Sequence, residues 1–128
     1  MPEHSTELRR HAITPYFTVR YADQLIDFLI AVFGATLVKE NRYGDNRVQH
    51  ARLLIGGSLI MLNESTEDYP PNVSQMHIVV EDTDNTYQSA LRLGCTDLME
   101  PNDRPHCERM AGIKDPCGNV WWIASPNS

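Results

Sequence analysis

Histidine, arginine and glutamate occur at two-residue spacing in stretches that predict β-strands. His50 and Arg52 form one such pair, and His106 and Glu108 form another. Residues i and i+2 of a strand lie on the same face, so each pair can act on one ligand. An imidazole can serve as a general base or a metal ligand, and a guanidinium can bind a carboxylate or phosphate through two parallel hydrogen bonds. Arg52 can instead pair with Glu108 or another acid and serve only the scaffold.

The segment Arg104-Pro-His-Cys-Glu-Arg109 concentrates further residue types that can do chemistry. On a shared strand face, His106 and Glu108 can combine with His77 or His50 in a metal or acid–base site. The alternative is a solvated loop beside the mouth of such a site. The sequence leaves both interpretations open.

Two adjacent tryptophans follow a turn signal near the end of the chain. The stretch Asp115-Pro-Cys-Gly-Asn119 has the Pro, Gly and Asn content of a turn, and a short β-prone run comes after it. Neighbouring residues of a strand point to opposite faces, so Trp121 and Trp122 lie in different environments. One of them is expected in the core, and the other faces something else.

The elements that position these residues form an internal repeat of about 61 residues. Val19 recurs as Val80, and Gly57 recurs as Gly118. Each copy predicts a strand, a helix and then three strands. The predicted strands are 13–20, 36–41, 47–55, 58–63, 75–81, 96–100, 109–114 and 120–125, and the predicted helices are 23–33 and 83–93.

We therefore predict an α+β fold in which two βαβββ modules form a curved mixed sheet with a cup-shaped cavity and helices on the outer face. The modules span about 12–64 and 74–126, and a polar, Pro-rich linker covers 65–73. Together they make one domain, 12–126, and residues 1–11 are expected to form a tail or an arm that crosses to a partner. The cup is the expected place of function.

Composition limits the classes of partner. The chain has 128 residues, with 11 basic and 17 acidic side chains and a net charge of −6. Nucleic acid is not an expected partner, because phosphate binding needs a basic stripe. No apolar stretch approaches the roughly 18 residues of a membrane span, and we expect a cytoplasmic protein without a membrane partner. Cys95, Cys107 and Cys117 are odd in number and lack CxxC spacing, so no disulfide framework is predicted.

Four segments, 21–35, 50–62, 77–84 and 114–124, together resemble the vicinal oxygen chelate superfamily, which contains glyoxalase I, bleomycin resistance proteins and extradiol dioxygenases. They include Tyr21-Ala-Asp-Gln-Leu-Ile-Asp-Phe28, and the ending Asp115-Pro-Cys-Gly-Asn-Val-Trp-Trp122 is similar to the DP-G-x-x-W ending of the PhnB-like, glyoxalase-related branch. The resemblance implies a homodimer. In enzymatic members it also implies a divalent metal in the cup, held by His, Gln or Glu.

The resemblance places the four metal-ligand positions at Thr14, Met61, Gln75 and Trp122. It also turns Trp122 into the cup and Trp121 toward the helix layer. An indole N–H only donates, and a thioether prefers soft copper, so we expect no cofactor and no metal of the superfamily type. The alternative is a divalent metal held by a shifted set of ligands. That set would be His77 with His50, His106 or Glu108.

The residues expected to line the cup and bind a ligand are Tyr16, Thr18, His50, Arg52, Met61, His77 and Trp122. We predict that they bind a small aromatic or cationic molecule without the superfamily metal. One alternative is a metal-dependent lyase or isomerase of glyoxalase type. The other is a metal-free enzyme with His77 or His50 as general base and Arg52 as the group that stabilises an oxyanion.

Overall fold

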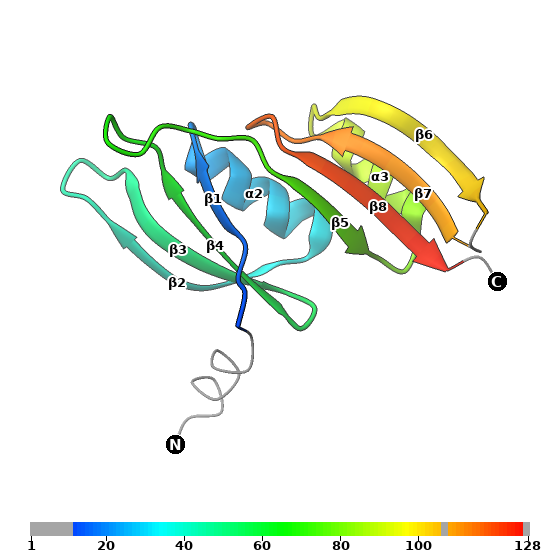
Figure 1. The fold of residues 1–128 in the computed structure, drawn as a ribbon, viewed down its shortest axis with the longest axis horizontal. Coiled ribbons are helices and arrows are strands. Elements are labelled where there is room, and N and C mark those ends of the chain that lie inside the picture. Colours follow the sequence, from blue (N-terminus) through cyan, green and yellow to red (C-terminus); the bar gives the residue numbers. More distant parts are fainter. Residues whose placement is uncertain (1–11, 106–107, 127–128) are drawn as a thin grey trace, which may run out of the picture.

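The fold consists of two four-stranded sheets, each covered on one face by a helix (Figure 1). The structure, a computed structural model, describes residues 12–105 and 108–126. Its elements are β1 (Tyr16–Val19), α2 (Ala22–Phe33), β2 (Thr36–Arg42), β3 (Val48–Ile55), β4 (Ser58–Glu64), β5 (Gln75–Val79), α3 (Thr83–Arg92), β6 (Thr96–Arg104), β7 (Glu108–Lys114) and β8 (Val120–Pro126). Sheet A has the strand order β1-β4-β3-β2, and sheet B has the order β5-β8-β7-β6.

This arrangement confirms the predicted α+β fold of two βαβββ modules. In each sheet the first strand of the module runs parallel to the last, and the other neighbours are antiparallel. In the described part of the chain, no strand of sheet A pairs with a strand of sheet B. Each sheet therefore has its own open face, which is the face turned away from its helix, and the surface of the predicted cup is divided between the two.

The two strand boundaries that differ most from the prediction both involve proline. β1 begins at Tyr16 rather than at residue 13, because Pro15 has no N–H to donate to a ladder. β6 continues to Arg104 although Pro101 lies inside it. β6 is an edge strand, where a proline is tolerated, and its register with β7 shifts around this position.

Both helices begin against a side chain from the last strand of their own module. Glu64 accepts hydrogen bonds from the backbone N–H groups of Tyr21 and Ala22 at 2.9 and 2.8 Å. In the second module, Ser125 accepts from the N–H of Thr83 at 3.3 Å. Such acceptors satisfy N–H groups that have no partner within the helix. Glu64 and Ser125 have the same separation in the chain as Ala22 and Thr83, so the internal repeat includes the caps.

Trp121 joins the two modules in one hydrophobic core. Its side chain is 3% exposed. Its ring stacks on Phe17 of β1 with centroids 5.8 Å apart, and it also contacts the rings of Phe28 and Phe33 on α2. Trp121 belongs to β8 of sheet B, so these contacts tie the second module to the first. The expectation that Trp121 packs in the core is confirmed.

A buried carboxylate holds the turn that precedes Trp121. Asp115 accepts hydrogen bonds from the backbone N–H groups of Cys117 and Asn119 and from the indole Nε1 of Trp121, the last at 2.8 Å. The Cys117 thiol donates to the carbonyl oxygen of Arg20 in the first module at 3.1 Å. Burial, with a smaller effect of nearby carboxylates, raises the pKa of this thiol to about 12, so it remains a protonated donor.

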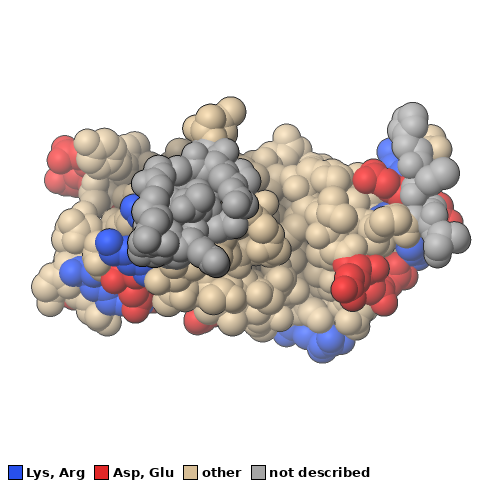
Figure 2. All heavy atoms as spheres, turned by 90° about the horizontal axis from the view of Figure 1, so that it is seen from below, with Lys and Arg blue, Asp and Glu red and all other residues tan. Residues whose placement is uncertain are grey.

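Charged side chains form small groups rather than one large charged patch on the face shown in Figure 2. Several of these groups combine Lys or Arg with Asp or Glu, and wide uncharged areas separate the groups (Figure 2). None of the helices in the described ranges is long and apolar enough to cross a membrane.

Candidate functional site

The open face of sheet A carries a hydrogen-bonded chain of three predicted site residues. Tyr16 lies on β1, and His50 and Arg52 lie on β3. The Tyr16 hydroxyl is 3.1 Å from Nδ1 of His50, and Nε of Arg52 donates to Nε2 of His50 at 3.0 Å. Because a guanidinium can only donate, Nε2 is the acceptor and the imidazole proton lies on Nδ1. The hydroxyl oxygen of Tyr16 therefore accepts from His50, and its own proton is left for a ligand.

The electrostatics of this face favour a neutral imidazole. Burial lowers the pKa of His50, and the cations Arg52 and Lys39 lower it further. Burial raises the pKa of Tyr16, and Tyr43 adds to this effect, whereas Arg52 opposes it. At neutral pH the imidazole is uncharged and the phenol is protonated, as the hydrogen bonds require.

The strand register adds Met61, Thr18 and Asn63 to this face. Met61 of β4 lies opposite both Tyr16 on β1 and Arg52 on β3. Thr18 lies opposite Asn63. The Oδ1 atom of Asn63 is buried and has no hydrogen-bond partner among the described residues. Buried acceptors normally have a partner, so Asn63 is a further candidate for ligand contact.

The open face of sheet B is built around Trp122 of β8. Its indole lies over Gly112 of β7, where a Cβ atom would stand 2.5 Å from Cζ3 of the ring. Its Nε1 donates to Oε1 of Gln75 on β5 at 2.7 Å. These two contacts hold the ring at the edge of a cavity of about 350 Å³. The residues that line this cavity are His77, Met99, Arg104, Met110 and Trp122.

His77 lies opposite Trp122 in the register of β5 and β8. Its Nε2 is 3.7 Å from a carboxylate oxygen of Glu108, and the two side chains are 47% and 37% exposed. An ion pair this exposed contributes little to stability. A carboxylate beside an imidazole can nevertheless orient it for acid–base chemistry, so the pair is a candidate for function on this face.

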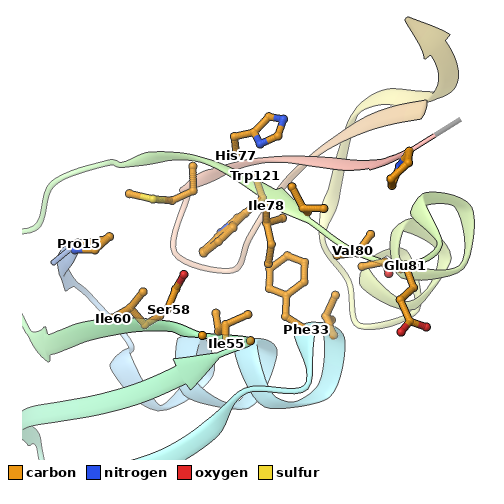
Figure 3. Close-up of a pocket in the computed structure, with 17 residues that line it drawn as sticks. Pro15, Phe33, Ile55, Ser58, Ile60, His77, Ile78, Val80, Glu81 and Trp121 are labelled. Carbon is orange, nitrogen blue, oxygen red and sulfur yellow. The ribbon is translucent and has the colours of Figure 1, made fainter. Parts of the chain in front are cut away.

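A larger groove of about 950 Å³ lies between the modules, beside the C-terminal end of α2 (Figure 3). Its lining is mainly apolar, and Ile55 and Ile60 of the first module face Ile78 and Val80 of the second. Of the predicted ligand-binding residues, all of which the structure describes, only His77 lines it. The groove is the larger space, but the polar groups that converge on one point lie on the two open faces.

Comparison with protein families identifies the family of this chain. A family model described as Glyoxalase/Bleomycin resistance protein/Dioxygenase superfamily matches residues 10–123. The chain belongs to this superfamily. The resemblance drawn from four sequence segments is thereby confirmed.

One similar sequence and two similar solved structures cover about 90% of this chain. The uncharacterized protein Rv0887c of Mycobacterium tuberculosis is 28% identical over an alignment of 126 positions, which covers 90% of this chain and 74% of that protein. TioX from Micromonospora sp. ML1 has a TM-score of 0.74 at 21% identity and covers 90% of this chain and 95% of its own. The PhnB protein from Bacillus cereus has a TM-score of 0.68 at 17% identity, with 90% and 99% covered. These structural likenesses show the shared fold.

Three of the four residues that the resemblance places at metal-ligand positions, Met61, Gln75 and Trp122, do not fit a divalent cation. Gln75 and Trp122 are hydrogen-bonded to each other, and the amide oxygen accepts from the indole. Met61 offers only a thioether, and hard divalent cations prefer carboxylate, imidazole or other oxygen ligands. Within residues 12–105 and 108–126, no group of three or more His, Cys, Asp or Glu side chains could hold a metal ion. That the protein works without a metal stays a prediction.

The structure places the predicted site residues in two groups, with Tyr16, Thr18, His50, Arg52 and Met61 on sheet A and His77 and Trp122 on sheet B. Among the described residues, the hydrogen-bond partner of the Arg52 guanidinium is His50, and a pair between Arg52 and Glu108 or another acid stays a prediction.

Of the shifted metal set, His77 and Glu108 lie close together on sheet B, and His50 does not join them. His50 lies on sheet A with both ring nitrogens hydrogen-bonded, and His77 lies on sheet B. His106 and Cys107 lie outside the described residues.

Sequence reasoning missed Met99, Met110 and Gly112. Met110 and Gly112 continue the i+2 series that begins at Glu108 on β7, so the alternation rule contained the signal for them. Met99 depends on the shifted register of β6. The contact of Gly112 depends on the orientation of the Trp122 ring, for which the sequence contains no signal.

Proposed function

We propose that the chain binds a small molecule with a planar aromatic ring, without a metal, in a cup formed by the open face of a sheet A and the open face of a sheet B. The observation that carries the proposal is the half-buried indole of Trp122, which Gly112 and Gln75 hold in place. Met99 and Met110 line the same cavity. Flat rings gain from stacking on an indole and from thioether contacts.

The cavity favours a flat ring, but it does not clearly favour a cationic ring over a neutral one. A cation gains from the face of an indole. Arg104 lines the same cavity and opposes a cation there. The flat ring is therefore the property that the proposal specifies.

The proposal includes a homodimer in which sheet A of one copy and sheet B of the other complete each cup. In one chain the two groups of site residues lie on different sheets. Exposed apolar side chains lie on or beside the edge strands β1 and β5, namely Ile13, Tyr16, Val73 and Val79. Apolar side chains along an unpaired strand edge are typical of a surface that another chain covers.

Fluorine NMR on protein labelled with 5-fluorotryptophan tests the binding site. Naphthamide and the naphthylmethylammonium cation serve as neutral and cationic ring probes. Both are expected to shift the Trp122 resonance in a saturable way and to leave buried Trp121 nearly unchanged. Trp122→Ala should weaken binding roughly tenfold, and a chelator should have no effect. A ring probe that leaves Trp122 unmoved, or binding that a chelator abolishes, would contradict the proposal.

A mixing experiment tests whether two copies share each cup. Arg52→Ala and Trp122→Ala each damage one half of the cup. In a mixed dimer with shared cups, one cup carries both substitutions and the other carries neither. Randomly mixed chains should thus recover about a quarter of the wild-type sites. No recovery, or a monomer in sedimentation velocity, would refute the shared cup.

A second candidate function is acid–base catalysis on the ring-bound molecule, with His77 as the base. The 3.7 Å approach of the Glu108 carboxylate to His77 favours it. His77→Gln should then abolish turnover of a substrate while the ring probes still shift Trp122. Equal turnover by the variant and the wild type would exclude this role.

A further inference from the structure

Arg52 is a half-buried cation to which the described residues bring no counter-charge. Its Nε donates to a histidine at 3.0 Å, and no carboxylate lies within ion-pair distance of it in the described part of the chain. Arg42, Arg47 and Arg109 each pair with an aspartate instead. A partly buried charge without a partner is unfavourable, because it loses water and gains no opposite charge. Arg52 is therefore placed to receive an anion.

His50 fixes the direction in which Arg52 donates. It occupies the Nε–H of Arg52 and leaves the two terminal nitrogens of the guanidinium, which together can hold both oxygens of one oxyanion. His50 also donates to the Tyr16 oxygen at 3.1 Å, as its tautomer requires. The imidazole thus holds two donors in position, the guanidinium fork and the Tyr16 O–H.

The strand register puts these donors in one row across sheet A. Tyr16 on β1, Met61 on β4, Arg52 on β3 and Lys39 on β2 lie opposite one another in succession. The cations Lys39 and Arg52 act together on His50, whose pKa they lower. The row is locally positive in a chain whose net charge is −6.

We infer that Tyr16, His50 and Arg52 form a subsite for an oxyanion, the carboxylate or phosphate group of the bound molecule. The inference deepens the proposed function and rests on it, since the ring of the same molecule lies against Trp122. The ligand class is then an aromatic acid or an aromatic phosphate. Arg52 and the Tyr16 hydroxyl touch the anion, and His50 is a positioning residue.

The first experiment examines sheet A alone, with probes that have no ring. Sodium acetate and sodium phosphate are titrated at constant ionic strength, with sodium chloride as the reference, while NMR follows the Arg52 Nε–H and the His50 ring. Both anions are expected to shift these signals in a saturable way. Tighter binding of acetate identifies a carboxylate ligand, and tighter binding of phosphate identifies a phosphate ligand. Shifts no larger than those with chloride would overturn the inference.

Matched variants separate a specific subsite from general attraction. Arg52→Gln should weaken anion binding at least tenfold, and Arg52→Lys, which keeps the charge without the fork, should lie between it and the wild type. Arg92→Gln removes the same charge from an exposed arginine on α3 that donates to the Ser89 hydroxyl, and it should change nothing. Equal losses in Arg52→Gln and Arg92→Gln would refute the subsite. Arg52→Lys remains informative if Arg52→Gln fails to fold.

The second experiment joins the subsite to the ring site. Naphthoate and naphthamide share a ring and differ in charge, so naphthoate should bind more tightly to the wild type and lose this preference in Arg52→Gln. If neither compound shifts Trp122 while acetate or phosphate binds at Arg52, the proposed function fails and the anion site stands. If both compounds bind equally well and no simple anion binds, the subsite fails and the proposed function stands.

Discussion

Gly112→Ala is the most direct test of the contact between Gly112 and the Trp122 ring. The new Cβ atom would lie 2.5 Å from Cζ3 and 2.9 Å from Cε3 of the indole. Carbon atoms in contact are about 3.5–4.0 Å apart, so the ring must move by about 1 Å. A movement of that size takes the 2.7 Å bond from Trp122 to Gln75 outside hydrogen-bond range.

The expected change in the free energy of unfolding follows from two opposed effects. Overpacking of this kind costs about 1–3 kcal/mol, and about 2 kcal/mol is expected for this half-buried ring, which also loses its hydrogen bond to Gln75. Replacing glycine by alanine in an unstrained backbone gains about 0.4–1 kcal/mol by restricting the unfolded chain. We therefore expect a net loss of about 1 kcal/mol and at least a tenfold weaker affinity for naphthamide. Urea unfolding and the fluorine resonance of Trp122 measure the two effects.

Two controls isolate the contact. Gly57→Ala meets no atom within 4 Å and should change stability by less than about 0.5 kcal/mol. In a Trp122→Leu background the same Gly112→Ala change should be neutral or stabilising, which gives a coupling energy of about 1 kcal/mol. If Gly112→Ala behaves like Gly57→Ala and leaves the Trp122 resonance in place, the ring does not rest on Gly112 and the reasoning is refuted.

Three further predictions concern the scaffold and the polar row. Asp115→Ala removes the acceptor of several buried N–H groups and should lower stability by about 2–4 kcal/mol in urea titrations; a loss under about 1 kcal/mol would show that water replaces the carboxylate. Glu64→Gln should cost about 0.5–1 kcal/mol by removing negative charge from the start of α2, and equal stability to wild type would contradict the cap. His50→Gln should flatten the pH dependence of stability. The folded pKa of His50 is lowered, so its contribution is complete above about pH 6.5 and is lost as the pH falls through the folded value. Urea unfolding at several pH values would reveal an unchanged slope if this is wrong.

Much of the fold follows from the sequence because each module repeats the same local signals. Residues that recur at one spacing predict the helices, the turns before β4 and β8, and the boundary between the modules. The repeat even predicts a helix cap at Glu64, although in the sequence this residue looks like the first residue of a polar linker. Its equivalence to Ser125 in the repeat contained the evidence that it caps a helix.

The site was less predictable because it depends on contacts between distant strands. Alternation correctly placed His50 and Arg52 on one face, but the bond from His50 to Tyr16 spans 34 residues and depends on the order β1-β4-β3. The resemblance placed two metal-ligand positions at Gln75 and Trp122 and said nothing of which residue lies opposite Trp122. In the register His77 lies opposite Trp122, and Gln75 reaches the indole through its side chain.

The two modules agree in scaffold and differ in the chemistry of their open faces. Asp23 pairs with Arg42 and Asp84 pairs with Arg109, so an aspartate in the first turn of each helix is tied to a strand of its own sheet.

On the open faces, equivalent positions of the repeat hold different chemistry. Tyr16 and Met61 of sheet A correspond to His77 and Trp122 of sheet B. Sheet A presents a cation and a hydroxyl donor, and sheet B presents an indole and thioethers. A symmetric ligand gains nothing from two unlike surfaces, so a molecule that uses both must itself have two unlike ends. A flat ring with an oxyanion attached is the simplest molecule that matches both faces.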